Sequence, residues 1–147
     1  MTTQKRADLR ETGESFEPVQ FTVSDEFNES YLHAEEDTDS RYLPGPGGGL
    51  VHPALLINKS HHMGSPSFRL DTGMAAVLTH NEVTFSNPGT IGRTFTVTFE
   101  VVDTYEKRGR PYQLVESLIF DDAGTEIMHR RSTYTHMGGP YPGAKQG

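Results

Sequence analysis

The sequence has no cysteine and no tryptophan among its 147 residues, and it contains no long apolar run. Without cysteine the chain forms neither disulfides nor zinc–thiolate sites, and catalysis by a thiol is excluded. No stretch approaches the roughly 20 apolar residues of a membrane-spanning helix, and residues 1–14 lack the apolar core of a signal peptide. We therefore expect a cytoplasmic protein with no membrane partner.

Basic residues are also scarce. The sequence has 13 Lys and Arg and 20 Asp and Glu, which gives a formal net charge of -7 at pH 7. Non-specific nucleic-acid binding needs a basic face, so we expect no nucleic-acid partner. One local basic patch does occur, where Lys107, Arg108 and Arg110 surround Gly109. Arg108 and Arg110 are therefore candidates for binding an anionic substrate, although a solvated hairpin turn carries such residues equally often.

The first half of the chain carries two helix signals. Ser24 is a good N-cap and precedes two acidic residues, which predicts a short amphipathic helix from Asp25 to about Glu36. A second helix is predicted to begin at Pro53, since proline is favoured at the first helical position. It follows a glycine-rich loop over residues 44–49 and is preceded directly by His52.

The second helix is expected to be buried. Leu55, Leu56 and Met63 would form its apolar face, and the breaker cluster Gly64-Ser65-Pro66 would end it. His61 and His62 would then lie at its C-terminal end, where a positive side chain is favourable. Asn58 would lie in mid-helix, as a substrate-binding candidate or as part of a solvent-exposed face.

The remaining elements read as β-strands. Strands are predicted over residues 16–23, 75–85, 91–105, 112–120 and 126–135. The clearest alternation places Phe95, Val97, Phe99 and Val101 on one face. Consecutive antiparallel strands must cover an apolar face, and the helix from Pro53 is the available cover. The prediction is one α+β domain, an antiparallel sheet wrapped around a central helix.

Three segments carry a family likeness. Residues 36–42 resemble an Asp-x-Asn-Pro-x-His motif, and residues 50–56 resemble a Val-His-Gly-Met helix start. Residues 80–110 resemble a pair of strands joined through a basic turn. Together they resemble the MaoC-like branch of the hot-dog fold, the (R)-specific enoyl-thioester hydratases and β-hydroxyacyl dehydratases. The resemblance implies a hot-dog domain over 15–136, between a flexible arm, 1–14, and a flexible tail, 137–147.

The resemblance also implies site residues. Asp37 falls at the position of the family's catalytic Asp, but Tyr42 stands where the family has its catalytic His. Pro53 replaces a glycine whose N–H helps to polarise the thioester carbonyl, and proline cannot donate that bond. The role would pass to a neighbour such as Ala54. His52 is the third catalytic candidate from its own position, because it lies at the junction of a loop and a helix and an imidazole exchanges protons near neutral pH. The alternative is a structural histidine bonded to a loop carbonyl.

A second histidine is a weaker candidate. His80 and Glu82 point the same way from a strand, so His80 is a candidate pocket residue, against the alternative of a polar outer face. Two ligands are too few to indicate a metal, which usually has three or more. We expect neither a metal nor another cofactor.

The resemblance implies a lyase that adds or removes water at the β-carbon of an acyl thioester, carried by coenzyme A or a carrier protein. It further implies a homodimer or a heteromer of hot-dog subunits. Two alternatives remain open, a non-catalytic or half-catalytic acyl-binding subunit of a heteromeric hydratase and a hot-dog thioesterase. A specialised biosynthetic enzyme without thioester dependence is a further possibility, given the glycine-rich loop and the altered dyad.

Overall fold

The computed structural model describes residues 10–45, 49–70 and 73–138. Its elements follow the chain as β1 (Ser15–Thr22), α1 (Asp25–Glu35), a 3₁₀ turn (Ser40–Tyr42), α2 (Pro53–Lys59), a second 3₁₀ turn (His62–Gly64), β2 (Met74–Phe85), β3 (Thr94–Lys107), β4 (Arg110–Asp121) and β5 (Glu126–Gly138). The five strands form one antiparallel sheet in the order β1-β3-β4-β5-β2. The predicted α+β class is confirmed.

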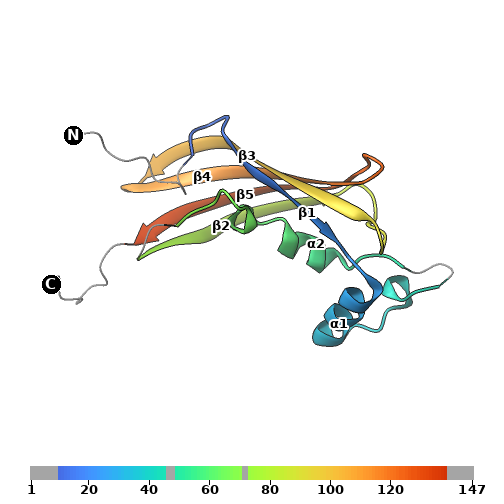
Figure 1. Ribbon diagram of the computed structural model, residues 1–147. Coiled ribbons are helices and arrows are strands. Elements are labelled where there is room, and N and C mark those ends of the chain that lie inside the picture. Colours follow the sequence, from blue (N-terminus) through green and yellow to red (C-terminus); the bar gives the residue numbers. More distant parts are fainter. Residues whose placement is uncertain (1–9, 46–48, 71–72, 139–147) are drawn as a thin grey trace.

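The helices lie at different places on this sheet. In Figure 1, α2 lies against one face of the sheet, and α1 lies beyond the end at which β1 finishes. The turn between β3 and β4 lies at the opposite end. Among the described residues, no helix is both long enough and apolar enough to cross a membrane.

The start of α1 follows its sequence signal. The Ser24 Oγ accepts the N–H of Phe27 at 3.1 Å, which satisfies one of the free donors of the first turn. The helix ends at Glu35, and Glu36 adopts a left-handed conformation with φ of 54°. Such a residue turns the chain sharply, and the segment that follows runs back toward α2.

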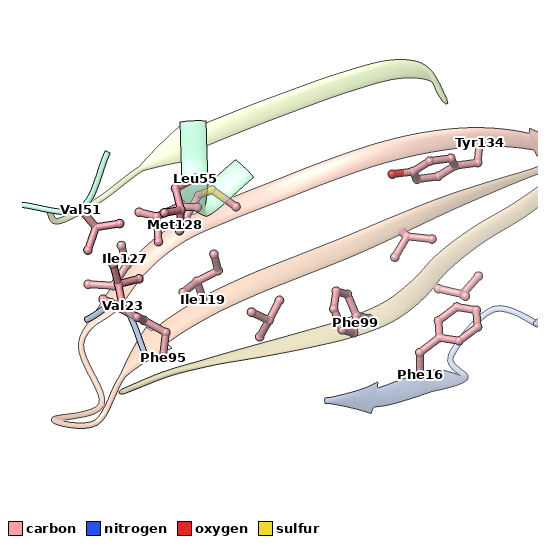
Figure 2. Packing of buried hydrophobic residues seen from close by; sticks show 14 residues of the cluster. Phe16, Val23, Val51, Leu55, Phe95, Phe99, Ile119, Ile127, Met128 and Tyr134 are labelled. Atoms are coloured by element: carbon pink, nitrogen blue, oxygen red, sulfur yellow. The ribbon is translucent and has the colours of Figure 1, made fainter. Parts of the chain in front are cut away.

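The core lies between the sheet and α2. The alternating residues predicted for β3, Phe95, Val97, Phe99 and Val101, are all buried. Figure 2 shows Val51 and Leu55 beside Ile127 and Met128 at one end of this core, with Phe16 and Tyr134 farther along the sheet.

The second helix is shorter than predicted, because α2 ends at Lys59. The Ser60 Oγ donates to the carbonyl oxygen of Ile57 at 2.6 Å, and Nη1 of Arg130 donates to the same oxygen at 3.0 Å. Serine competes for backbone groups in this way and favours helix ends. The prediction that Met63 extends the buried face is wrong, since Met63 is 39% exposed and His62 is buried instead.

The chain ends also have described parts. Residues 10–14 of the expected arm follow the sheet, where the N–H of Gly13 donates to the Val101 carbonyl at 2.8 Å. At the other end, β5 continues to Gly138. The rest of the expected arm and tail, residues 1–9 and 139–147, lies outside the described residues, as do residues 46–48 of the glycine-rich loop.

Candidate active site

His52 is the N-cap of α2. Its Nδ1 accepts the N–H of Ala54 at 3.1 Å, and its backbone is extended, with φ of -61° and ψ of 130°. Pro53, at the first helical position, has no N–H to satisfy. A ring nitrogen that accepts a hydrogen bond carries no proton, so the neutral imidazole has its proton on Nε2.

That Nε2 faces Asp37. The distance from Nε2 of His52 to Oδ2 of Asp37 is 3.0 Å, so the N–H donates to the carboxylate. Both groups are partly buried, with side-chain exposures of 18% for His52 and 29% for Asp37. The structure therefore joins two residues that lie 15 positions apart in the sequence, and both were predicted for the site.

Asp37 is held on its other side by the backbone. Its Oδ1 accepts the N–H of Asp39 at 2.9 Å, and its own N–H donates to the Leu32 carbonyl at 3.0 Å. Asp39 in turn caps the 3₁₀ turn and pairs with the Arg41 guanidinium at 2.8 Å. The carboxylate of Asp37 is thus oriented by one side-chain donor and one backbone donor.

Two tyrosine rings contact the imidazole of His52. The ring centre of Tyr42 lies 4.7 Å from that of His52, and the ring centre of Tyr31 lies 5.7 Å away. Tyr42 was a predicted site residue, whereas Tyr31 was not among the candidates. The site therefore contains one carboxylate, one imidazole and two phenol-bearing rings.

An apolar cleft of about 360 Å³ adjoins this group of residues. Tyr42 and Pro53 belong to both the cleft wall and the surroundings of His52. The other lining residues come from three segments, and they are Arg41, Leu50, Val51, Leu56, Phe85, Ser86, Asn87, Pro88 and Gly89. A cleft with this lining is suited to an apolar group placed beside a proton-transfer pair.

The other predicted substrate-binding residues lie apart from His52. Asn58 is exposed six residues farther along α2, a rise of about 9 Å, and lines a second cleft together with Lys59 and His61. His80 is exposed, pairs with Glu82 at 3.2 Å and lies about 17 Å along β2 from Phe85 of the first cleft.

Arg108 and Arg110 lie at the turn between β3 and β4. A side-chain carbon added at Gly89 of the cleft wall would lie 3.2 Å from the Phe95 ring, so Phe95 lies next to this wall. The turn begins twelve residues later, about 40 Å along β3. Figure 1 shows this turn at the opposite end of the sheet from α1. Within a single chain, the predicted residues Asp37, Tyr42, His52 and Ala54 therefore lie together. The other four predicted residues lie apart from them, and they are Asn58, His80, Arg108 and Arg110.

The region beyond the C-terminal end of α2 was not anticipated from the sequence. His62 is 1% exposed, neither of its ring nitrogens has a hydrogen-bond partner among the described residues, and its ring packs against Phe16, Phe68 and Tyr134. Burial, followed by the charges of His136, His61 and Arg130, lowers the pKa of His62 to about 3. His62 is therefore neutral near pH 7, not the cation expected at a helix end.

Arg130 is the buried cation of this region. Its Nε donates to Oδ1 of Asn81 at 2.7 Å, and its Nη1 donates to Oγ of Ser60 at 2.8 Å and to the Ile57 carbonyl. Burial lowers the pKa of Arg130. No group of three or more His, Asp or Glu side chains suited to a metal occurs among the described residues.

No protein-family model and no curated protein matches the sequence. Solved structures do match. A MaoC-like dehydratase from Rhodospirillum rubrum has a TM-score of 0.72 and 16% identity, over 90% of this chain and 96% of that one. The C-terminally truncated HadBC (3R-hydroxyacyl-ACP dehydratase) complex from Mycobacterium tuberculosis has a TM-score of 0.70 and 16% identity, over 87% and 98%. A 1,4-dihydroxy-2-naphthoyl-CoA thioesterase from Synechocystis has a TM-score of 0.56 and 14% identity, over 91% and 88%.

These matches define the class of protein. The chain has the hot-dog fold, as predicted, with a carboxylate–imidazole pair at the start of its central helix. Within that class its structural neighbours include MaoC-like dehydratases, which confirms the predicted resemblance as a likeness of fold.

Proposed function

We propose that the protein is a hydro-lyase that adds water to, or removes it from, the β-carbon of an acyl thioester carried by coenzyme A or a carrier protein. The observation that carries the proposal is the 3.0 Å contact between Asp37 and His52 beside an apolar cleft. A carboxylate oriented by two donors is suited to accept a proton from water. The structural neighbours described as dehydratases support the same reaction.

In the hydration direction Asp37 is the general base. It takes one proton from a water molecule whose oxygen bonds to the β-carbon, and the proton is then returned to the α-carbon, so that the enzyme is unchanged. His52 donates its Nε2–H to the carboxylate, which directs Asp37 toward the water. Nδ1 of His52 stays with Ala54, so the imidazole orients the base and retains its own proton.

The developing negative charge on the thioester oxygen needs a donor. The Ala54 N–H is bonded to His52, and the Leu55 N–H is bonded to the carbonyl oxygen of His52 at 3.0 Å. Pro53 has no N–H. We therefore assign this role to the phenol of Tyr42, which lines the cleft and carries the only hydroxyl group among the site residues predicted from the sequence.

The edge of the sheet supports an assembly of two hot-dog subunits. Among the described residues β2 pairs only with β5, and its exposed apolar side chains include Val77, Leu78 and Phe85, each more than 40% exposed. An open edge with apolar side chains favours pairing with another strand. We propose a homodimer or a heteromer formed along β2.

A second candidate function is an acyl-binding subunit that completes a heteromeric hydratase. Tyr42 in place of the family His and the hydrogen bond already made by the Ala54 N–H favour it. The match to the HadBC complex supports an assembly of this kind.

One experiment separates the candidates. The protein, purified alone, is incubated with a short trans-2-enoyl-CoA, and the loss of the conjugated enoyl absorbance is followed beside the release of free thiol. Loss of the enoyl signal without thiol release supports the hydro-lyase. Thiol release identifies a thioesterase, and inactivity that a hot-dog partner restores identifies the heteromer subunit.

A further inference from the structure

We propose that Asn28 and Tyr31 of α1 are positioning residues for the Asp37–His52 pair, an inference that rests on the proposed hydro-lyase activity. Asn28, Tyr31 and Leu32 are spaced i, i+3 and i+4, so they share one face of the helix. Each of the three contacts a different part of the candidate site. The helix α1 therefore orients the residues of the candidate site through these contacts.

Asn28 fixes the segment that carries Tyr42. Its side chain is 2% exposed, and its Nδ2 donates to the carbonyl oxygen of Tyr42 at 2.8 Å. Its buried Oδ1 has no hydrogen-bond partner among the described residues. A flipped amide would bring two acceptor oxygens together at the Tyr42 carbonyl, so the donation alone accounts for the orientation of this amide.

Tyr31 contacts the imidazole itself. Its ring is half-buried and tilted by 55° relative to that of His52. Burial, followed by the carboxylate of Glu35, raises the pKa of the Tyr31 phenol, which keeps that phenol neutral. The ring restricts the rotation of the imidazole that points Nε2 at Asp37 and Nδ1 at Ala54.

Leu32 contacts the candidate site through its backbone. Its carbonyl accepts the N–H of Asp37 at 3.0 Å, directly after the left-handed turn at Glu36. Two side chains of α1 thus contact Tyr42 and His52, and one backbone carbonyl at its C-terminal end contacts Asp37. None of these contacts uses an atom that the proposed reaction consumes, which is the pattern of residues that act by positioning.

The test compares matched variants of the full chain. Tyr31→Leu removes the ring beside His52, and Tyr31→Phe keeps it. Phe27→Leu makes the same kind of change on the same helix at a residue that contacts Lys59. Asn28→Asp replaces the donor with a carboxylate oxygen, and Ser30→Asp adds the same charge on the exposed side of α1.

We expect Tyr31→Leu and Asn28→Asp each to lower kcat about tenfold or more while KM changes less than about twofold, because misplacement of a catalytic group acts on the chemical step. Tyr31→Phe, Phe27→Leu and Ser30→Asp should stay close to wild type. Melting temperatures establish that each variant is folded. Should Asn28→Asp fail to fold, Tyr31→Leu decides the matter, since Tyr31 is only half-buried.

A second readout is independent of activity. The ¹⁵N chemical shifts of the His52 ring nitrogens report the tautomer, which should be the Nε2–H form in wild type and a mixture in Tyr31→Leu. Unchanged shifts and unchanged kcat in Tyr31→Leu would overturn the positioning role. If the shifts are altered in Tyr31→Leu but the wild-type protein hydrates no enoyl thioester, the positioning role of Tyr31 stands and the proposed function is overturned.

Discussion

At the first turn of α2, His52 uses both ring nitrogens in hydrogen bonds and remains partly exposed. Just beyond the last turn, His62 is fully buried, and neither of its ring nitrogens has a partner within the described part of the chain. The surroundings account for this difference. His52 faces a carboxylate beside a cleft, and His62 faces three aromatic rings with Arg130 nearby. Near one short helix, the same residue type is therefore suited to proton chemistry at one end and to packing at the other.

The first and largest expected effect concerns the N-terminal end of α2. His52→Ala and Asp37→Ala should each lower kcat/KM for an enoyl thioester by about 10²- to 10⁴-fold, because a positioned proton-transfer pair is lost. His52→Ala should also reduce the free energy of unfolding by about 1 kcal/mol, since the helix loses its N-cap. Steady-state kinetics and urea unfolding measure the two effects.

The variant His52→Asn separates the loss of activity from the loss of the helix cap. Asparagine is a strong N-cap, so the free energy of unfolding should return close to the wild-type value while activity stays low. If His52→Asn is as active as wild type, His52 is only a cap and the proposed contrast between the two ends disappears.

The second prediction concerns pH and the C-terminal end of α2. Because the folded protein keeps His62 neutral, with a pKa of about 3 against 6.5 for an ordinary histidine, the unfolded chain binds the extra proton as pH falls below about 6.5. The His62 contribution to stability is present above that pH and should fall by about 3 kcal/mol between pH 7 and pH 4. Urea unfolding at both values measures it.

His62→Leu is the control, since leucine does not titrate. Between pH 7 and pH 4 its free energy of unfolding should fall by less than that of wild type. The difference between the two falls should equal the contribution of His62, about 3 kcal/mol. Equal losses in the two proteins would show that His62 is not buried in the neutral form. The neighbouring groups His61, His136 and Arg130 are unchanged in this variant, so their own pH dependence cancels in the comparison.

The third prediction tests Arg130 beneath the same helix end. Arg130→Met should lower the free energy of unfolding by about 2 kcal/mol, because the Ile57 carbonyl, the Ser60 hydroxyl and the Asn81 amide oxygen lose a charged donor. Thermal unfolding measures the loss. An increase in stability would mean that the desolvation of the guanidinium outweighs its three hydrogen bonds.

The smallest expected effect is at the far end of the sheet. Since Arg108 and Arg110 lie about 40 Å along β3 from the cleft, the double change to alanine should alter KM less than about twofold. A KM increase of tenfold or more would instead support the sequence-based assignment of this turn to substrate binding, through a partner subunit.

Local signals predicted the fold well. The cap at Ser24, the start of α2 at Pro53 and the alternation from Phe95 to Val101 each depend on neighbouring residues, and each is confirmed. The length of α2 was missed because its end depends on Arg130, which reaches Ile57 from a strand about 70 residues later.

The arrangement of the candidate site could be predicted only in part, because it also depends on contacts between distant segments. His52 was a candidate from its place before Pro53, and Asp37 was one from the family resemblance. Their hydrogen bond requires the turn at Glu36 to bring them together. The burial of His62 depends on rings from distant segments, Phe16 and Tyr134, which no local pattern reveals. The spacing of Asn28 and Tyr31 places both on one helix face, and this could be seen in the sequence. The contact of Tyr31 with His52 could not be predicted from that spacing, because it depends on where α2 lies.

The most direct test of the proposed reaction is a crystal structure of Asp37→Asn with a bound trans-2-enoyl thioester. The account predicts that the acyl group occupies the cleft of Tyr42 and Pro53, with its β-carbon beside the side chain at position 37 and its carbonyl oxygen facing the Tyr42 phenol. An acyl group bound beside His80, or at the second cleft near Asn58, would contradict it.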